Sequence, residues 1–200
     1  MSAPLPILYI VRHGETAWSA AKRHTGRTDL PLTETGERDA RELGARLQGL
    51  AFARVWTSPL QRAARTCALA GFAGVAQVDP DLVEWNYGDY EGLTSADIQL
   101  RRPGWSLFRD GVPNGETLAD VGARADRVVQ RVRFEAGDVL LFSSGHLLRV
   151  LAARWLGLDA STGRYLVLGT TALCALGYDH DRGEPAIRLW NASSSAARVS

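Results

Sequence analysis

Two short apolar runs constrain the fold most, because neither alternates with polar residues. Residues 7–11 read Ile-Leu-Tyr-Ile-Val and residues 139–142 read Val-Leu-Leu-Phe. A strand that is apolar on both faces is typical of a parallel sheet that helices cover on both sides. Each run is followed by a polar loop and then by residues at helical spacing. The two runs therefore predict an α/β fold.

Helices and strands alternate along the rest of the chain. The predicted strands cover residues 7–11, 54–56, 139–142, 173–178 and 186–190, and the predicted helices cover residues 33–47, 59–70, 95–101, 117–131 and 146–156. Ser58 is the expected N-cap of the second of these helices, with Pro59 at its first position. This alternation predicts a three-layer α/β/α sandwich with a largely parallel sheet, in one domain that spans residues 1–200.

Two segments depart from this alternation. Residues 80–115 hold five Trp, Tyr and Phe residues among many Gly, Pro and charged residues. We expect this irregular excursion to cover the carboxyl ends of the strands, where ligands of open α/β sheets bind. Residues 191–200 are rich in Ser and Ala and are predicted to form a frayed tail.

Charge and composition exclude several classes of protein. The chain has 23 Lys and Arg against 22 Asp and Glu, a net charge of +1, so it is not expected to bind nucleic acid or a membrane surface. No apolar run reaches the roughly 18 residues of a membrane span. Cys67 and Cys174 are too few for a disulfide framework or a four-ligand zinc site. We expect a cytoplasmic protein and leave its oligomeric state open.

The strongest chemical signal follows the first predicted strand. Arg12, His13 and Gly14 lie at its carboxyl end, where an arginine and a histidine can meet an anionic ligand. The signatures of dinucleotide-binding folds, P-loop NTPases and zinc proteases are absent from the sequence, and so is the GxSxG motif of α/β-hydrolases.

Further motifs occur in order along the chain and identify a family. Arg12-His13-Gly14-Glu15-Thr16 is followed by the blocks at residues 23–29 and 31–36, by Ser-Pro-Leu-Gln-Arg-Ala at 58–63, and by Glu-Trp-Asn-Tyr-Gly-Asp-Tyr-Glu-Gly at 84–92. Together they resemble the histidine phosphatase superfamily, which includes the phosphoglycerate mutases. The resemblance extends from about residue 7 to residue 190.

The resemblance implies four catalytic residues. His13 matches the nucleophile that forms a phosphohistidine, and Arg12 and Arg62 match the arginines that clamp the phosphate. Glu84 matches the general acid that protonates the leaving oxygen and later activates water. Because guanidinium groups can neutralise the developing charge, neither a metal nor a cofactor is required.

Several other residues compete for these roles or accompany them. Arg65 is the competing clamp, and Asp89 and Glu91 are the alternative acids, with Glu91 read as structural. His24 and His180 are assigned to loops, with the cavity as the alternative place for His24. The resemblance and the sequence around it suggest six substrate-binding residues, namely Ser19, Thr25, Gly26, Ser144, Gly145 and His146.

The chain departs from the family at the second active-site histidine. The family places that histidine before a Gly that leads into a helix, and the aligned residue here is Ser144. Serine is also an ordinary N-cap between a strand and a helix. His146 follows two residues later, and a rotation of about 200° predicts that it points away from the position that Ser144 faces.

The resulting functional hypothesis is a metal-independent phosphatase of small phosphorylated metabolites, with sugar phosphates expected and turnover weakened by Ser144. The segments 84–92 and 113–116 look most like a sugar-phosphatase branch, with a fructose or sedoheptulose bisphosphatase as the nearest guess. A phosphoglycerate mutase is the second hypothesis. The third is a non-catalytic protein that binds a phosphorylated metabolite.

Overall fold

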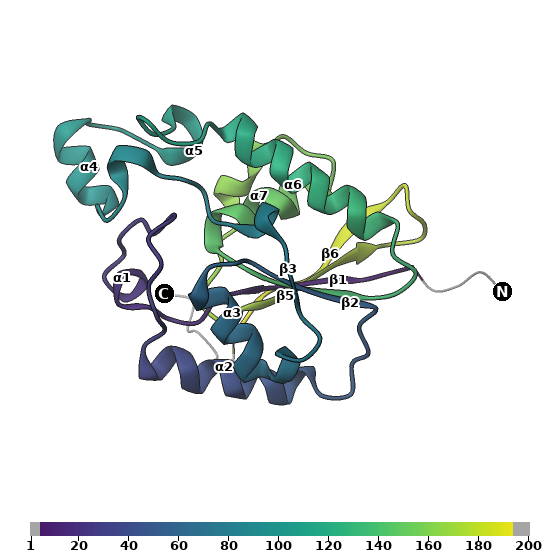
Figure 1. Ribbon diagram of the computed structural model, residues 1–200. Coiled ribbons are helices and arrows are strands. Elements are labelled where there is room, and N and C mark those ends of the chain that lie inside the picture. The colour runs from purple at the N-terminus through teal and green to yellow at the C-terminus, as the bar shows by residue number, and fades with distance from the viewer. Residues whose placement is uncertain (1–4, 194–200) are drawn as a thin grey trace.

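Six strands form one sheet in the computed structural model, which describes residues 5–193. The strands are β1 (Leu8–Arg12), β2 (Arg54–Thr57), β3 (Gln77–Val78), β4 (Val139–Ser143), β5 (Leu173–Tyr178) and β6 (Pro185–Ala192). Their order across the sheet is β3-β2-β4-β1-β5-β6 (Figure 1). Only β5 runs opposite to the other five strands, because it pairs antiparallel with both β1 and β6. The predicted α/β class with a largely parallel sheet is confirmed.

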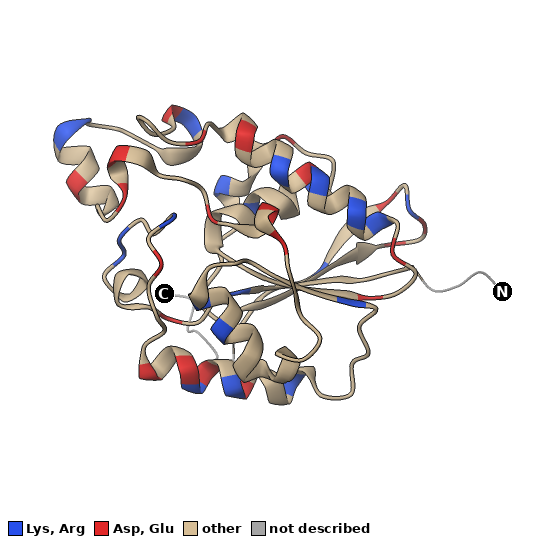
Figure 2. Ribbon diagram, viewed as in Figure 1, with Lys and Arg blue, Asp and Glu red and all other residues tan. Residues whose placement is uncertain are grey.

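Helices cover both faces of this sheet. α2 (Glu34–Leu47) and α3 (Gln61–Cys67) lie on one face, and α6 (Leu118–Arg133) and α7 (Gly145–Trp155) lie on the other (Figure 1). Side chains alternate along β1, so that Leu8 and Ile10 pack into the core beneath α6 and α7, while Val11 packs into the core beneath α2 and α3. Figure 2 shows the charged residues of α2 and α6 along their outer faces.

Short elements connect these layers. They are α1 (Ala17–Ala20), the π-helix η1 (Ala68–Phe72), the 3-10 helices η2 (Pro80–Leu82), η3 (Gly88–Tyr90) and η4 (Ala160–Tyr165), and the α-helices α4 (Ser95–Arg101) and α5 (Leu107–Asp110). The irregular excursion of residues 80–115 contains η2, η3, α4 and α5. Within residues 5–193, no helix combines the length and the apolar character that crossing a bilayer requires.

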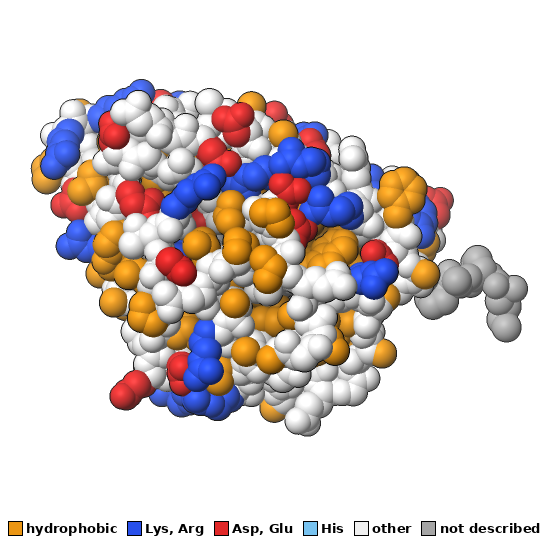
Figure 3. All heavy atoms as spheres, viewed as in Figure 1, with side chains coloured by type: hydrophobic (Ala, Val, Ile, Leu, Met, Phe, Trp, Pro, Cys, Tyr) orange, Lys and Arg blue, Asp and Glu red, His pale blue; other side chains and the backbone are white. Residues whose placement is uncertain are grey.

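Ion pairs attach the beginning of the excursion to α6. Asp81 accepts hydrogen bonds from Arg127 and Arg131, the Arg127 contact at 2.5 Å, and Arg131 also pairs with Asp79. The view in Figure 3 shows basic side chains gathered over α6, with acidic ones among them. Charged contacts between segments about 50 residues apart therefore hold the excursion against this layer.

The prediction that Ser58 is the N-cap of a helix is wrong. Its backbone N–H donates to the carbonyl of Phe142 at 2.9 Å, so Ser58 continues the sheet pairing of β2, and α3 begins three residues later at Gln61. The predicted end of this helix near Gly71 lies within η1, where Gly71 has a φ of 98°.

The predicted beginning of the tail also differs from the structure. Asn191 and Ala192 are the last residues of β6. The Oδ1 atom of Asn191 accepts the backbone N–H of Gly169 at 2.7 Å, and the Asn191 N–H donates to Cys174 Sγ. These contacts explain the longer strand. The rest of the predicted tail, residues 194–200, lies outside the described part of the chain.

Candidate active site

A cavity of about 320 Å³ opens at the carboxyl ends of β1 and β4. The excursion and the loop after α1 supply its other walls. Its lining residues are Arg12, His13, Ser19, Lys22, Arg23, His24, Thr25, Glu84, Tyr87, Ser95, Gly145, His146, Arg149 and Leu168. The structure thus gathers most of the predicted site residues into one cavity, but Arg62, Gly26 and Ser144 are not among those that line it.

His13 lies directly after β1, and its side chain is 3% exposed. The Nδ1 atom lies 2.7 Å from the Gly14 carbonyl oxygen, which can only accept, so Nδ1 carries the ring hydrogen. Burial lowers the pKa of His13 well below 6.5, and the charges of Arg12 and Arg62 lower it further. The ring is therefore neutral, and Nε2 keeps a free lone pair.

The backbone around His13 is held tightly from several sides. The N–H of Thr171 lies within 3.2 Å of the carbonyl oxygens of both Arg12 and His13, and Thr171 itself has a φ of 54°, which is strained for a β-branched residue. At Gly14, a Cβ atom would lie 2.7 Å from the Gly36 carbonyl oxygen. Only glycine fits there, so α2 packs directly against the loop that carries His13.

Arg62 is fully buried and Arg12 is partly buried, and neither side chain forms an ion pair with a described carboxylate. Arg12 Nη1 donates to the Leu168 carbonyl at 2.6 Å. Arg62, fully buried, donates to carbonyl oxygens of the loop at residues 25–28 at 2.7–3.1 Å. In both side chains Nε is buried without a hydrogen-bond partner among the described residues. Buried charges are normally paired, so this arrangement favours an anionic ligand.

Glu84 connects the excursion to the first turn of α7. Its Oε1 atom accepts the backbone N–H groups of Trp85 and Leu147, both at 2.9 Å, and Oε2 accepts that of His146 at 3.0 Å. Glu84 therefore caps α7, although it lies about 60 residues away in sequence. Because Oε2 accepts only one of the three N–H groups, it is the oxygen with room for a proton.

Ser144 occupies the N-cap position of α7 but does not act as a cap. Its side chain is fully buried, makes no capping hydrogen bond, and leaves Oγ without a partner among the described residues. His146 lines the cavity, whereas Ser144 does not. The structure therefore brings His146 rather than Ser144 to the cavity, whereas the helical rotation predicted that His146 points away from the position that Ser144 faces.

The other predicted substrate-binding residues make contacts within the protein. Ser19 donates its hydroxyl hydrogen to the Thr16 carbonyl at 3.0 Å as part of the cap of α1. Thr25 donates its own to the Arg23 carbonyl at 3.1 Å. The Gly26 N–H donates to Glu91 Oε1 at 2.8 Å, and a Cβ at Gly26 would lie 2.6 Å from the Trp85 carbonyl oxygen. Ser19 and Thr25 remain candidates to touch substrate, while Gly26 allows close packing behind the cavity.

The competing residues lie away from the cavity lining. Arg65 pairs with Glu37 at 2.9 Å on the exposed side of α3. Asp89 accepts a hydrogen bond from the Asn114 side chain, and Glu91 accepts the N–H groups of the loop at residues 26–28. Arg65 and Asp89 are exposed, whereas Arg62 and Glu84 are buried, and this difference favours Arg62 and Glu84 as the candidates.

Sequence reasoning missed several residues that converge here. His24 is not among them, because it lies in a loop as assigned and also lines the cavity, the alternative place given for it, with its ring 4.9 Å from that of Tyr87. Lys22, Arg23 and Arg149 add positive charge to the same wall. Basic residues in a loop, as Lys22 and Arg23 are, or on a helix, as Arg149 is, are ordinary surface features, so only the folded arrangement identifies these three.

Arg124 is a further missed residue, and it positions the segment that carries Glu84. It forms a bidentate ion pair with Glu116 at 2.8 and 2.9 Å and donates to the carbonyl oxygens of Asp81 and Val83, both at 2.8 Å. The sequence signal was an arginine at a core position of the amphipathic pattern in α6, between Val121 and Val128.

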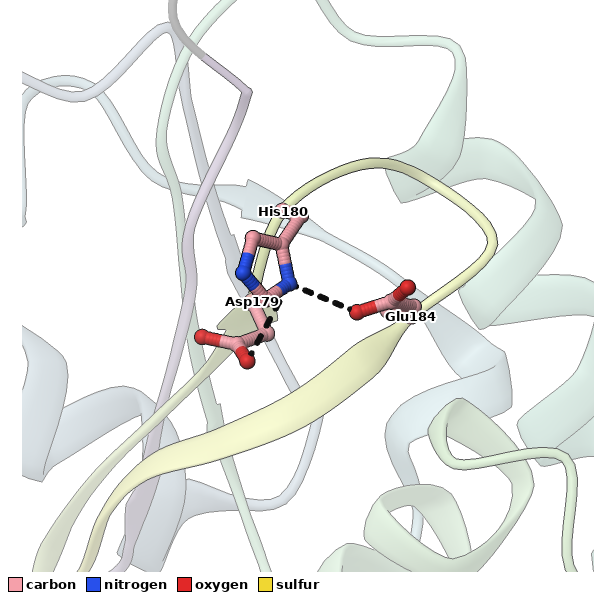
Figure 4. A group of neighbouring side chains, drawn as sticks. All are labelled: Asp179, His180 and Glu184. Carbon is pink, nitrogen blue, oxygen red and sulfur yellow. Dashed lines mark hydrogen bonds and ion pairs between the residues drawn. The ribbon is translucent and has the colours of Figure 1, made fainter.

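Among residues 5–193, one group of side chains has the spacing of a metal site, and it lies far from this cavity in the loop between β5 and β6 (Figure 4). His180 Nδ1 contacts Glu184 at 2.8 Å and Asp179 at 3.3 Å. All three side chains are exposed, and the ion pairs account for their proximity. His180 thus lies in a loop, as predicted.

Comparison with known proteins identifies the family. The model of the histidine phosphatase superfamily (branch 1) matches residues 8–193. The chain belongs to this superfamily. An acid phosphatase of Mycobacterium tuberculosis is 40% identical over 178 residues, which cover 86% of this chain and 87% of that protein.

Two further members of the superfamily extend the comparison. The sedoheptulose 1,7-bisphosphatase of Saccharomyces cerevisiae is 38% identical and is matched over 79% of this chain and 70% of its own length. The solved structure of the Mycobacterium tuberculosis Rv3214 product superimposes with a TM-score of 0.88 and 36% identity, covering 94% of this chain and 98% of the other. The curated relatives named here are thus phosphatases, and the fold is that of the histidine phosphatases.

Proposed function

We propose that this chain hydrolyses phosphate monoesters of small metabolites, sugar phosphates above all, through a phosphohistidine at His13 and without a metal. The observation that carries the proposal is a pair of arginines, Arg12 and Arg62, each with a buried Nε that has no partner among residues 5–193, beside a neutral histidine. A phosphoryl group carries about two negative charges and three acceptor oxygens, which would satisfy both arginines.

The first step transfers the phosphoryl group to the enzyme. Nε2 of His13 attacks phosphorus with its lone pair, the N–P bond forms, and the bond between phosphorus and the ester oxygen breaks. A proton on Oε2 of Glu84 goes to the departing oxygen, so that an alcohol leaves and Glu84 becomes a carboxylate. Arg12 and Arg62 stabilise the charge on the equatorial oxygens.

The second step regenerates the enzyme. Glu84 accepts a proton from water, the water oxygen attacks phosphorus, and the N–P bond breaks to return neutral His13 and free phosphate. Serine is shorter than the histidine that the family places at residue 144 and carries no charge, so we expect it to supply no equivalent donor to the transferring group. Losing one preorganised donor typically costs about 10²–10³ in turnover, and slow hydrolysis is therefore expected.

The charge of the cavity wall supports substrates with a second anionic group. Arg12, Lys22, Arg23 and Arg149 line the cavity together with a single carboxylate, that of Glu84. One phosphate beside Arg12 and Arg62 leaves the other three cations unneutralised. Sugar bisphosphates, including fructose and sedoheptulose bisphosphates, fit this excess of positive charge.

The test is a panel of sugar mono- and bisphosphates assayed for phosphate release by the unmodified chain, Ser144→His and His13→Ala. We expect slow release by the unmodified chain, faster release by Ser144→His and none by His13→Ala. Acid-labile ³²P should appear on the unmodified chain and be absent from His13→Ala. Phosphate release no faster than the background rate by both the unmodified chain and Ser144→His would refute the proposal.

A second candidate function is binding without turnover, favoured by the buried hydroxyl of Ser144. Tight sugar-phosphate binding with no phosphoenzyme and no gain from Ser144→His would favour this candidate. Conversion of 3- to 2-phosphoglycerate without phosphate release would instead indicate a mutase.

A further inference from the structure

A hydrogen-bonded pair in the cavity wall takes no part in the steps above. The hydroxyl of Tyr87 lies 2.5 Å from Nδ1 of His146, joining the excursion to the second residue of α7. Tyr87 is only 2% exposed, and the rings of His24 and Phe108 lie 4.9 Å from Tyr87 and 5.6 Å from His146, respectively. The pair is therefore fixed by packing from both sides.

The protonation of this pair follows from its surroundings. Burial raises the pKa of Tyr87 well above 10, so the phenol keeps its hydrogen. Burial lowers the pKa of His146 well below 6.5, and the charge of Arg149 lowers it further, so the imidazole is neutral. A neutral imidazole has one N–H and one acceptor nitrogen.

The two possible arrangements differ in which hydrogen is left without an acceptor in the protein, and exposure decides between them, because Tyr87 is 2% exposed whereas His146 is only partly buried. If Nδ1 carried the hydrogen, the Tyr87 hydroxyl hydrogen would have no acceptor among residues 5–193, since this pair is the only hydrogen bond that the hydroxyl makes there. If Tyr87 donates to Nδ1, the ring hydrogen is on Nε2. Nε2 makes no hydrogen bond to a described residue, and His146 lines the cavity, so Nε2–H is available to a ligand.

We propose that Tyr87 is a positioning residue that holds His146 as the Nε2–H tautomer, and that His146 is thereby a specificity-determining donor to an oxygen of the substrate's carbon skeleton. The backbone N–H of His146 binds Oε2 of Glu84, the proposed acid, which places His146 on the leaving-group side of the cavity. A hydroxyl or carbonyl oxygen close to the ester oxygen is the group that this donor fits. The substrate contact rests on the proposed function, whereas the tautomer does not.

The tautomer is tested by long-range ¹H–¹⁵N NMR on the full chain with ¹⁵N-labelled histidine, with His146→Gln used for assignment. We expect His146 to show a protonated Nε2 and an unprotonated Nδ1, unchanged between pH 8 and pH 6. In Tyr87→Phe we expect a mixture of tautomers or protonation within that range. A hydrogen on Nδ1 in the wild type, or an unchanged spectrum in a folded Tyr87→Phe chain, overturns the proposal.

The substrate contact is tested with fructose 1,6-bisphosphate and with p-nitrophenyl phosphate, whose leaving group has no hydroxyl neighbour. Loss of one neutral hydrogen bond should raise KM for the sugar phosphate about 3- to 10-fold in Tyr87→Phe, with kcat/KM for the aryl ester within about 2-fold. His146→Gln keeps an N–H at the position of Nε2 and should retain most of the affinity, whereas His146→Asn should lose it.

Two outcomes separate this inference from the proposed function. If no substrate is hydrolysed, the same ratios are measured as Kd for fructose 1,6-bisphosphate by calorimetry, and the NMR result stands independently of turnover. Equal losses on both esters, or equal effects of the Gln and Asn variants at His146, overturn the assignment of His146 as the donor.

Discussion

Glu84→Gln is the substitution with the most informative outcome, because one carboxylate has two tasks. Glu84 accepts three backbone N–H groups at 2.9–3.0 Å, two of them from the first turn of α7. The amide of glutamine keeps one acceptor oxygen, but its NH₂ group faces an N–H donor. A hydrogen bond to a charged group contributes about 1.5–3 kcal/mol. Adding the lost attraction to the helix dipole, we expect unfolding to become easier by about 2–4 kcal/mol.

Thermal unfolding followed by circular dichroism measures this loss directly. For a chain of this length, about 2–4 kcal/mol corresponds to a decrease in Tm of roughly 5–15 °C. Asp89→Asn is the matched control, because Asp89 lies in the same excursion but is exposed, and among residues 5–193 its carboxylate accepts a hydrogen bond only from the Asn114 side chain. We expect that variant to change stability by less than about 0.5 kcal/mol. A Tm of Glu84→Gln within 2 °C of the wild type would refute the capping role.

Activity of the same variant separates capping from acid catalysis when it is assayed below both unfolding transitions. Loss of the acid should slow hydrolysis of an alkyl phosphate by about 10²–10⁴. An aryl phosphate with an acidic leaving group needs little protonation, so its hydrolysis should slow much less. Equal losses on the two esters would remove Glu84 from the role of acid.

Three further predictions follow from buried or exposed groups. Ser144→Ala should leave the free energy of unfolding unchanged or raise it by up to about 1 kcal/mol, because the hydroxyl that it removes is buried without a partner among residues 5–193. A decrease of about 1 kcal/mol in the unfolding free energy measured by chemical denaturation, which is usual when a true N-cap is removed, would contradict this. His13 has a pKa well below 6.5 in the folded chain, so the unfolded chain binds its proton first and stability is lost as pH falls below 6.5. His13→Gln should make the slope of unfolding free energy against pH shallower by about 1.4 kcal/mol per pH unit. An unaltered slope in urea titrations would show that His13 is not held neutral. Lys22→Ala should raise KM for fructose 1,6-bisphosphate more than KM for fructose 6-phosphate, and added salt should diminish this difference. An equal rise of KM for both esters would show that the second phosphate does not bind beside Lys22.

Elements with a local signal were predictable from sequence. Residues 95–101 form a helix as predicted, and Thr94 caps it with a hydrogen bond that the adjacent residues alone can form. The same is true of α6, which Thr117 caps. Ser58 and Pro59 gave an equally good local signal, but the pairing of Ser58 with Phe142 extends the strand instead. Contacts between segments distant in sequence override local preference at that point.

The residues of the candidate site also fall into those that the sequence predicted and those that only the fold brings together. Arg12, His13, Arg62 and Glu84 were expected because they lie in motifs, and the structure places them close together. Lys22, Arg149 and the Tyr87–His146 pair come from segments that are far apart in sequence. Nothing in the local sequence indicates that these side chains meet, because their proximity depends on how the excursion packs against α7.

The attachment of Glu84 to α7 has a consequence for how substrate enters and product leaves. Swinging the excursion open at this point would break the two N–H bonds from α7 to Glu84, and Arg124 also holds the carbonyl oxygens on either side of Leu82. With a cost of about 2–4 kcal/mol, such an open form would make up only about 0.1–3% of the molecules. Exchange of ligand is therefore expected past Lys22 and Arg23, which are exposed and line the cavity, and the rate of product release should depend on ionic strength rather than on a hinge motion.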